Sequence, residues 1–256
     1  MNRAIKLHLR VFEIHGITLR VVTLRPHTRV RFSTNRFHDT WHLLSGPAGA
    51  MLLGRLLWGL AFQRHPGTLV LIAGEHLVPT PFEADPPDPI MLVPDAITRI
   101  DDDLLRALKL RLRRSPGSPT TIRWHTFGMP AALPERRPRW HQPGATREHI
   151  SRRAGYVCYT APAEILRHNA LAIYSMHTGN ANYMPLAERT SKTWHYDGEF
   201  QVIPGFDDDV SAAIVARREI IGERRLLGGD DERGAVWDRA VATGRRLRSG
   251  RSRGPR

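Results

Sequence analysis

The sequence is poor in cysteine and in lysine, and each shortage excludes a class of protein. A single cysteine, Cys158, cannot form an intramolecular disulfide, so this chain of 256 residues is no disulfide scaffold and we expect a reducing, cytoplasmic setting. Three of the 38 basic residues are lysine, namely Lys6, Lys109 and Lys192. A nuclease that needs a lysine beside paired carboxylates therefore has few places for it, and no cysteine pair exists for a zinc knuckle.

Several motifs and long apolar runs are missing as well. There is no G-x-S-x-G nucleophile elbow and no Tyr-x-x-x-Lys pair. The first fourteen residues alternate charged and apolar side chains, unlike a secretory signal. Residues 43–62 are apolar on nearly every side, but Arg55 near their middle would cost about 2.5–3.5 kcal/mol in a bilayer. Pro47 and the glycines of this segment weaken a membrane span further, so we expect a buried core helix.

Arginine is in excess, and the excess lies at the two ends of the chain. The net charge is +7 over residues 1–36 and +7 over residues 239–256, whereas the body between them carries −1. Charge concentrated at the chain ends indicates a polyanionic partner, because charge that only keeps a surface soluble would be spread along the whole chain. The alternative explanation is GC-rich coding, which raises arginine together with alanine, glycine and proline.

The N-terminal segment has the periodicity of antiparallel strands. Residues 4–14 and 17–24 alternate apolar and polar side chains, with a turn at His15-Gly16 between them. The polar face of the first strand carries Lys6, His8 and Arg10. Residues 29–32 are a third candidate strand, and we expect these strands to extend one edge of a larger sheet.

A buried helix followed by a buried strand forms the centre of the predicted fold. Ser45 as N-cap and Pro47 as first helical residue predict a helix over about 47–63, and the β-branched run 68–73 predicts a strand. Strands and helices alternate after residue 45, which is typical of α/β proteins. We therefore predict an α/β fold, a mixed sheet with antiparallel N-terminal strands, a buried central helix and a disordered basic C-terminal tail. One domain would span 1–244 (antiparallel strands about 4–32, α/β body about 37–244), with residues 245–256 as the tail.

Aspartate clusters mark two further helix starts. Asp101 to Asp103 precede a leucine-rich segment that ends in arginines, which favours a helix, although its alternating leucines leave a hairpin as the alternative. Asp207–Leu227 is predicted to be helical, and a last short helix to span 231–243. The proline-rich segments 79–94 and 128–149 are expected to be loops, the first a lid or a connector. Other expected elements are strands over 120–127, 155–160 (burying Cys158) and 200–203, and a helix over 162–177.

Gly46-Pro-Ala-Gly49 opens the central helix and resembles a nucleotide-binding turn in part. A Walker loop is disfavoured, because Arg55 and Leu56 stand where Lys and Ser or Thr are needed. A Rossmann-like variant stays open, with Glu75 after the next strand to bind a ribose hydroxyl. The alternative is that the glycines permit close packing. If the nucleotide-binding interpretation is correct, Gly46 and Gly49 are the ligand-binding residues.

Histidines supply the candidate metal ligands. His38 and His42 are four residues apart, a spacing that places two imidazoles on one face of a helix starting near residue 36. A third ligand is not identifiable from the sequence. His195 and Asp197 form the start of a facial triad for iron, but no histidine follows them to complete it. We predict instead a ligand-binding loop over 179–199 that presents Asn180, Asn182, His195 and Asp197, with a surface Ω-loop as the alternative.

Two arginine-rich segments are the candidate nucleic-acid contacts, because arginine clamps phosphates and tryptophan stacks on unpaired bases. Their residues are Arg136, Arg137, Arg139, Trp140, Arg245, Arg246, Arg248, Arg251 and Arg253. The leading hypothesis is a cytoplasmic protein that associates with nucleic acid or another polyanion, without base specificity. One alternative is an enzyme or small-ligand protein, with or without a metal or nucleotide, whose pocket lies near Gly46–Gly49, His38/His42 and the loop 179–199. Another is a structural subunit of a larger assembly that docks on an acidic protein surface.

Overall fold

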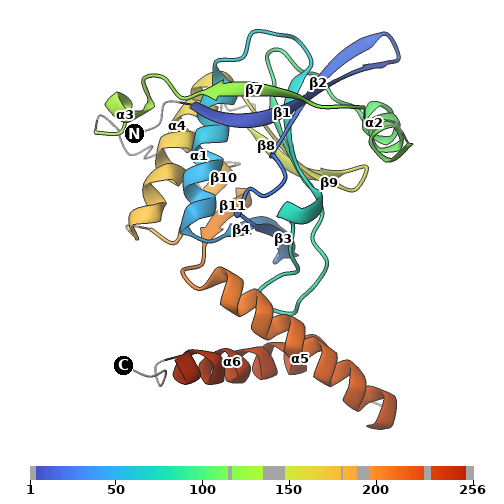
Figure 1. The fold of residues 1–256 in the computed structure, drawn as a ribbon, viewed down its shortest axis with the longest axis vertical. Helices are drawn as coiled ribbons and strands as arrows, with labels where there is room; N and C mark the ends of the chain where they lie inside the picture. The colour runs from blue at the N-terminus through green and yellow to red at the C-terminus, as the bar shows by residue number, and fades with distance from the viewer. Residues whose placement is uncertain are drawn as a thin grey trace.

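The fold combines two mixed β-sheets with helices that pack between and beside them (Figure 1). It comes from a computed structural model that describes residues 4–114, 117–134, 148–179, 181–188, 196–227 and 232–251. Parallel and antiparallel strand pairs occur in both sheets. The predicted α/β class with antiparallel N-terminal strands is confirmed. The expectation of one sheet is wrong, because the two strands that precede the central helix pair with two strands between residues 183 and 202 to form a second sheet.

The larger sheet holds seven strands in the order β7-β1-β2-β5-β6-β9-β8. The predicted N-terminal hairpin lies inside this sheet, because β7 pairs with the outer side of β1 and takes the edge. The central strands β5 and β6 are buried along their whole length. The bounds of the strands are β1 Ala4–Ile14, β2 Ile17–Thr23, β5 Thr68–Ile72, β6 Ile90–Pro94, β7 Thr120–His125, β8 His149–Arg153 and β9 Tyr156–Ala161.

The smaller sheet holds four strands in the order β10-β11-β4-β3. Its strands are β3 Phe32–Phe37, β4 Thr40–Ser45, β10 Tyr183–Glu188 and β11 Tyr196–Val202. The short helix expected near residue 36 is wrong, since β3 and β4 form a hairpin there. Its turn residues His38 and Asp39 have φ of 46° and 62°, and two successive positive φ values match the twist of a two-residue hairpin.

Helix α1 (Pro47–Ala61) is the buried central helix that the sequence predicts. It packs along α4 (Ala163–Ser175), and Figure 1 shows the two helices side by side. Two glycines let α1 approach its neighbours closely, Gly54 towards α4 and Gly59 towards β7. A Cβ on Gly54 would lie 2.7 Å from the Ala170 carbonyl oxygen, and one on Gly59 would meet the Trp124 indole. Within the described residues, no helix is long and apolar enough to cross a membrane.

The remaining helices lie at the periphery. They are α2 Asp102–Arg114, α3 Met129–Ala132, α5 Phe206–Leu227 and α6 Glu232–Arg251, with 3₁₀ turns at Gly74–His76 (η1) and Met176–Thr178 (η2). The helix prediction for 101–114 is confirmed over the hairpin alternative. Asp101 caps α2, because its Oδ1 accepts a hydrogen bond of 2.7 Å from the Leu104 N–H.

Helix α6 continues beyond the residue where the sequence predicts disorder. Val236 and Ala240 of α6 pack against small apolar side chains of α5, including Ala213 and Ala216. This contact supports the first turns of the helix, and arginine is a good helix former, so the backbone stays helical from 244 to Arg251. Residues 252–256 lie outside the described residues.

The proline-rich segment before β6 is a connector that holds α5 and α6. Asp85 accepts hydrogen bonds of 2.7 Å from Arg217 of α5 and 2.8 Å from Arg233 of α6. The rings of Phe82 and Trp237 lie 5.3 Å apart beside these ion pairs. The C-terminal helices are therefore attached to the body by both charge and aromatic contact.

Candidate functional sites

Most of the predicted nucleic-acid contacts fall where the structure gives no side-chain positions. Those outside the described residues are Arg136, Arg137, Arg139, Trp140 and Arg253, as are the candidate ligand-binding residues Asn180 and His195. Arg245, Arg246, Arg248 and Arg251 belong to the last turns of α6. Their contribution to binding stays a prediction.

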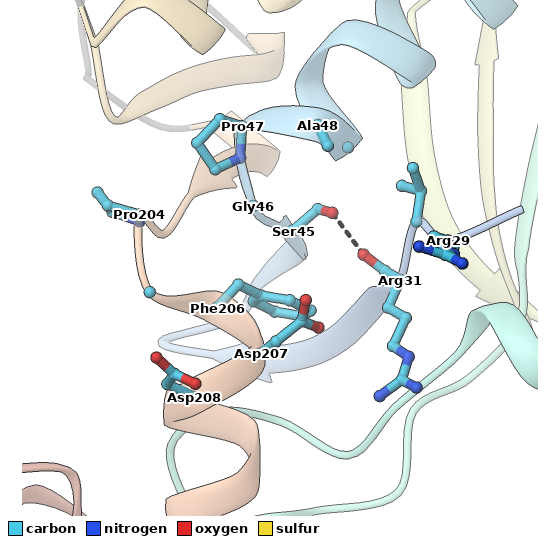
Figure 2. Close-up of a pocket in the computed structure, with 13 residues that line it drawn as sticks. Arg29, Arg31, Ser45, Gly46, Pro47, Ala48, Pro204, Phe206, Asp207 and Asp208 are labelled. Carbon is cyan, nitrogen blue, oxygen red and sulfur yellow. Dashed lines mark hydrogen bonds between the residues drawn. The ribbon is translucent and has the colours of Figure 1, made fainter. Parts of the chain in front are cut away.

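The glycine-rich entrance of α1 does line a pocket, of about 320 Å³ (Figure 2). The first turns of α1 and α5 meet there, and Gly46 lies close to Phe206 at the beginning of α5. The charges around it are mixed. Asp207 and Asp208 come from α5, whereas Arg29 and Arg31 come from the segment before β3, as Figure 2 shows.

The Rossmann-like interpretation of this entrance is wrong. A Rossmann unit needs the strands before and after the helix in one sheet, but β4 belongs to the smaller sheet and β5 to the larger. The packing explanation for Gly49 holds instead. A Cβ on Gly49 would collide with the Ser45 side chain, whose hydroxyl donates a hydrogen bond to the Arg31 carbonyl.

His38 and His42 do not share a helix face. His38 lies exposed at the tip of the β3–β4 hairpin, whereas His42 is buried in β4. Among the described residues, no group of three or more potential metal ligands comes together. The predicted metal centre therefore gains no support from this part of the chain.

His42 has a different partner, which comes from the far end of the sequence. Its Nε2 lies 3.5 Å from Oε1 of Glu199, the residue that faces it in the parallel β4–β11 ladder. Both side chains are buried, and the Gln201 amide donates a hydrogen bond to Glu199. Burial lowers the pKa of His42 below 6.5, and the Glu199 carboxylate opposes this shift.

The His42–Glu199 pair belongs to a polar row across the smaller sheet. Asn35 of β3 pairs with His42 on its other side, and its buried Oδ1 has no hydrogen-bond partner in the described chain. The pKa of Tyr196 is raised to about 12, mainly by burial and to a smaller extent by a hydrogen bond to Glu199. A buried histidine–carboxylate pair beside an unsatisfied amide oxygen makes this row a candidate ligand site.

The structure separates the other two predicted ligand-binding residues. The Asn182 carbonyl accepts a hydrogen bond of 2.7 Å from the Val202 N–H, at the end of β11 that pairs with Ser45. Asp197 is at the opposite end of β11, where its Oδ2 lies 3.9 Å from Nδ1 of His149. Five residues of a strand span about 17 Å, so Asn182 and Asp197 do not form one site.

A larger cavity, of about 880 Å³, opens where β1 and the chain after β2 part. Pairing between the two strands ends at His8 and Thr23, whereas Ala4 to Leu7 continue to pair with β7 on the other side. Leu52 of α1 also lines the gap. The polar and aromatic lining residues are Lys6, Arg25, His27, Thr28, Arg123, His125 and Phe127.

The charge of this cavity is of one sign. Among the described residues that line it there is no aspartate or glutamate, and Lys6 lies directly opposite Arg123 in the β1–β7 ladder. Like charges on opposed residues destabilise a strand pair. Neither side chain makes an ion pair within the described chain. Burial, with Arg25 and Arg10, lowers the pKa of the neighbouring His8.

An aromatic pair stands beside these cations. The rings of His125 and Phe127 are stacked, with centroids 4.8 Å apart and an angle of 11° between their planes. Phe127 is 59% exposed, and its backbone carbonyl accepts a hydrogen bond of 2.9 Å from the Trp58 indole of α1. An exposed ring on an anchored backbone is available to a ligand.

Part of this cavity was visible in the sequence. The period of residues 4–14 places Lys6, His8 and Arg10 on one face, but Arg123, His125 and Phe127 were expected only as members of a strand. Their convergence follows from the β1–β7 pairing, for which no local signal exists. Comparison with models of known protein families, with curated proteins and with solved structures found no match for this chain.

Proposed function

We propose that the protein binds nucleic acid or another polyanion through exposed arginine and lysine side chains, without reading base sequence. The opposed pair of Lys6 and Arg123 is the observation that carries this proposal. Keeping two like charges opposite each other costs stability, and a bound phosphate backbone would remove that cost by neutralising both. Arg25 adds a third cation to the same cavity.

The arginine-rich segments supply further positive charge in this proposal. Arg136, Arg137 and Arg139 with Trp140 form one group, and the arginines from Arg245 to Arg253 form the other. Contacts to phosphate fix a protein on its polyanion but carry no sequence information. We therefore expect affinity that depends on salt much more than on base composition.

Salt-dependent binding to duplex DNA tests the proposal. Cutting the chain at residue 238 would remove Ala240 from its contact with α5 and break the Arg239–Glu219 ion pair. Substitution to glutamine is cleaner, at Arg245, Arg246, Arg248, Arg251 and Arg253. Loss of five phosphate contacts should change the slope of the logarithm of the binding constant against the logarithm of the salt concentration by about 4.5 on duplex DNA.

A second variant, Lys6→Gln with Arg123→Gln, tests the cavity and should flatten the same slope by about 2. The matched control is Arg99→Gln, an exposed arginine that does not line the cavity. If the binding of both glutamine variants to duplex DNA and heparin depends on salt concentration as steeply as that of the wild-type protein, the proposal is overturned.

The His42–Glu199 pair favours a second candidate, a small-ligand protein or enzyme that transfers a proton at this row. Its metal-dependent form can be checked by metal analysis of protein purified without a histidine tag. Stoichiometric zinc or iron that disappears in His42→Ala would support it. A metal-free wild-type protein would count against it.

A further inference from the structure

We infer that the cavity between β1 and the chain after β2 binds single-stranded nucleic acid, with one base stacked on the Phe127 ring. This inference rests on the proposed function and gives its ligand a class. The cavity brings together the two parts that such a ligand needs, cations for phosphates and an exposed aromatic face for a base.

The aromatic pair favours an unpaired base over a duplex. In a duplex, both faces of each base are covered by neighbouring bases, so an exposed ring has nothing to stack on. In a single strand the base face is open, and stacking on an aromatic ring is worth about 1–3 kcal/mol per base. Phe127 is 59% exposed and its ring is already stacked against His125, so it needs little ordering to receive a base.

The cations are placed to follow a backbone past that ring. Arg123 and His125 share one face of β7, and Lys6 lies opposite Arg123. Phe127 follows the end of the strand, with its ring stacked on that of His125. Arg25 and His27 line the cavity from the chain after β2. A phosphate chain between these two groups would meet positive charge on both sides.

The size of the cavity and the edge of β1 fit the same ligand. A volume of about 880 Å³ is in the range of small-molecule sites, which span about 300–1,000 Å³. On the side that faces the cavity, residues 5–7 of β1 have no partner strand in the described chain, since pairing with β2 ends at His8. Backbone N–H and C=O groups along that edge are available to the edge of a base.

Fluorescence anisotropy with a labelled oligothymidylate of about 12 nucleotides tests the inference, with a mixed-sequence duplex and heparin as comparison probes. We expect Phe127→Ala to weaken oligothymidylate binding about 5-fold or more and to leave duplex and heparin binding unchanged. Lys6→Gln with Arg123→Gln should weaken all three probes, because charge is common to them.

The matched control is Phe37→Ala. Phe37 is 56% exposed and also contacts a histidine ring, that of His38 at 4.0 Å, but it lies on the β3–β4 hairpin outside the cavity. Ultraviolet cross-linking of the oligothymidylate adds an independent readout. We expect the cross-link on the tryptic peptide that follows Arg123, which contains Phe127.

The outcomes separate this inference from the proposed function. The single-strand inference is overturned if Phe127→Ala binds oligothymidylate as tightly as the wild-type protein while the charge variant, Lys6→Gln with Arg123→Gln, binds it more weakly. That result leaves polyanion binding standing. Wild-type affinity of the charge variant for every probe removes the cavity from the proposed function as well. If Phe127→Ala and Phe37→Ala lose the same amount of affinity for oligothymidylate, the stacking role of Phe127 is overturned as well.

Discussion

His42 and Glu199 face each other on neighbouring parallel strands, with His42 Nε2 3.5 Å from Glu199 Oε1. Both side chains are buried in the smaller sheet, although β4 and β11 are far apart in the sequence. A buried, paired histidine makes stability depend on pH in a direction that follows from its pKa.

The first prediction is a loss of stability in mild acid that depends on His42. Burial lowers its pKa in the folded state below the unfolded value of 6.5, so between those two values the unfolded chain binds more protons. Stability is therefore fully present above about pH 6.5 and falls as the pH drops through the folded pKa. Urea unfolding at about pH 8 and pH 5.5 should show this fall in the wild-type protein.

His42→Gln should reduce that fall without abolishing it, because burial also lowers the pKa of His76. His65→Gln is the control, since His65 is exposed outside the smaller sheet. A fall of the same size in His42→Gln and the wild-type protein would contradict the prediction.

The second prediction concerns the single cysteine. Cys158 is buried in β9, and burial raises the pKa of its thiol to about 12. At pH 8 the thiolate would be roughly one part in ten thousand, and the thiolate is the reactive form. Titration with a chromogenic disulfide should find no reactive thiol in the folded protein and one per chain in urea. Rapid labelling of the folded protein would contradict the burial of Cys158 in β9.

The third prediction reverses the usual ranking of alanine and glycine in a helix. Alanine normally favours a helix over glycine by about 1 kcal/mol. In Gly54→Ala the new methyl would lie 2.7 Å from both the Ala170 carbonyl oxygen and the Tyr174 Cβ, so α1 and α4 would have to separate. We expect a loss of about 1–3 kcal/mol in the free energy of unfolding. Met51→Ala, at an exposed position of the same helix, should change it by about 0.5 kcal/mol or less.

The fourth prediction concerns the attachment of the C-terminal helices. Asp85 binds both Arg217 and Arg233, and its side chain is 24% exposed. Asp85→Asn should cost about 1–2 kcal/mol, because charge-assisted hydrogen bonds to two arginines weaken together. The control is Asp103→Asn, whose ion pair with Arg106 is of equal length but largely exposed, and which should be nearly neutral.

Limited proteolysis gives a second readout for that contact. Asp85→Asn should expose α6 to trypsin earlier than the wild-type protein does, since Arg233 loses its partner. Equal cleavage rates in Asp85→Asn and Asp103→Asn would show that the aromatic contact between Phe82 and Trp237 holds α6 without the ion pairs.

Local patterns predicted the long elements well. Strand β1, helix α1 and helix α5 match the expected segments closely, because each has a strong period, a cap or an aspartate start that acts within its own residues. Strands β6, β8 and β10 were missed. β6 forms the end of the proline-rich segment 79–94, which was expected to be a loop, and β8 and β10 are short strands without a clear alternation of apolar and polar residues.

Contacts between distant segments could not be predicted in the same way. The short helix expected from near residue 36 is replaced by the β3–β4 hairpin, and β4 also pairs with β11, which comes much later in the sequence. The glycines of α1 were ambiguous between phosphate binding and packing until Ser45, Tyr174 and Trp124 were seen against them.

The sequence by itself determined the α/β class, the buried α1 helix, the basic face of β1 and the placement of charge at the chain ends. Those properties depend on residues that are near one another along the chain. The tertiary structure alone decided that there are two sheets, that His42 meets Glu199, and that Lys6, Arg123 and Phe127 surround one cavity. Strand pairing between distant segments fixes these relations, because its hydrogen bonds join backbone groups that every residue carries and so leave little trace in side-chain order.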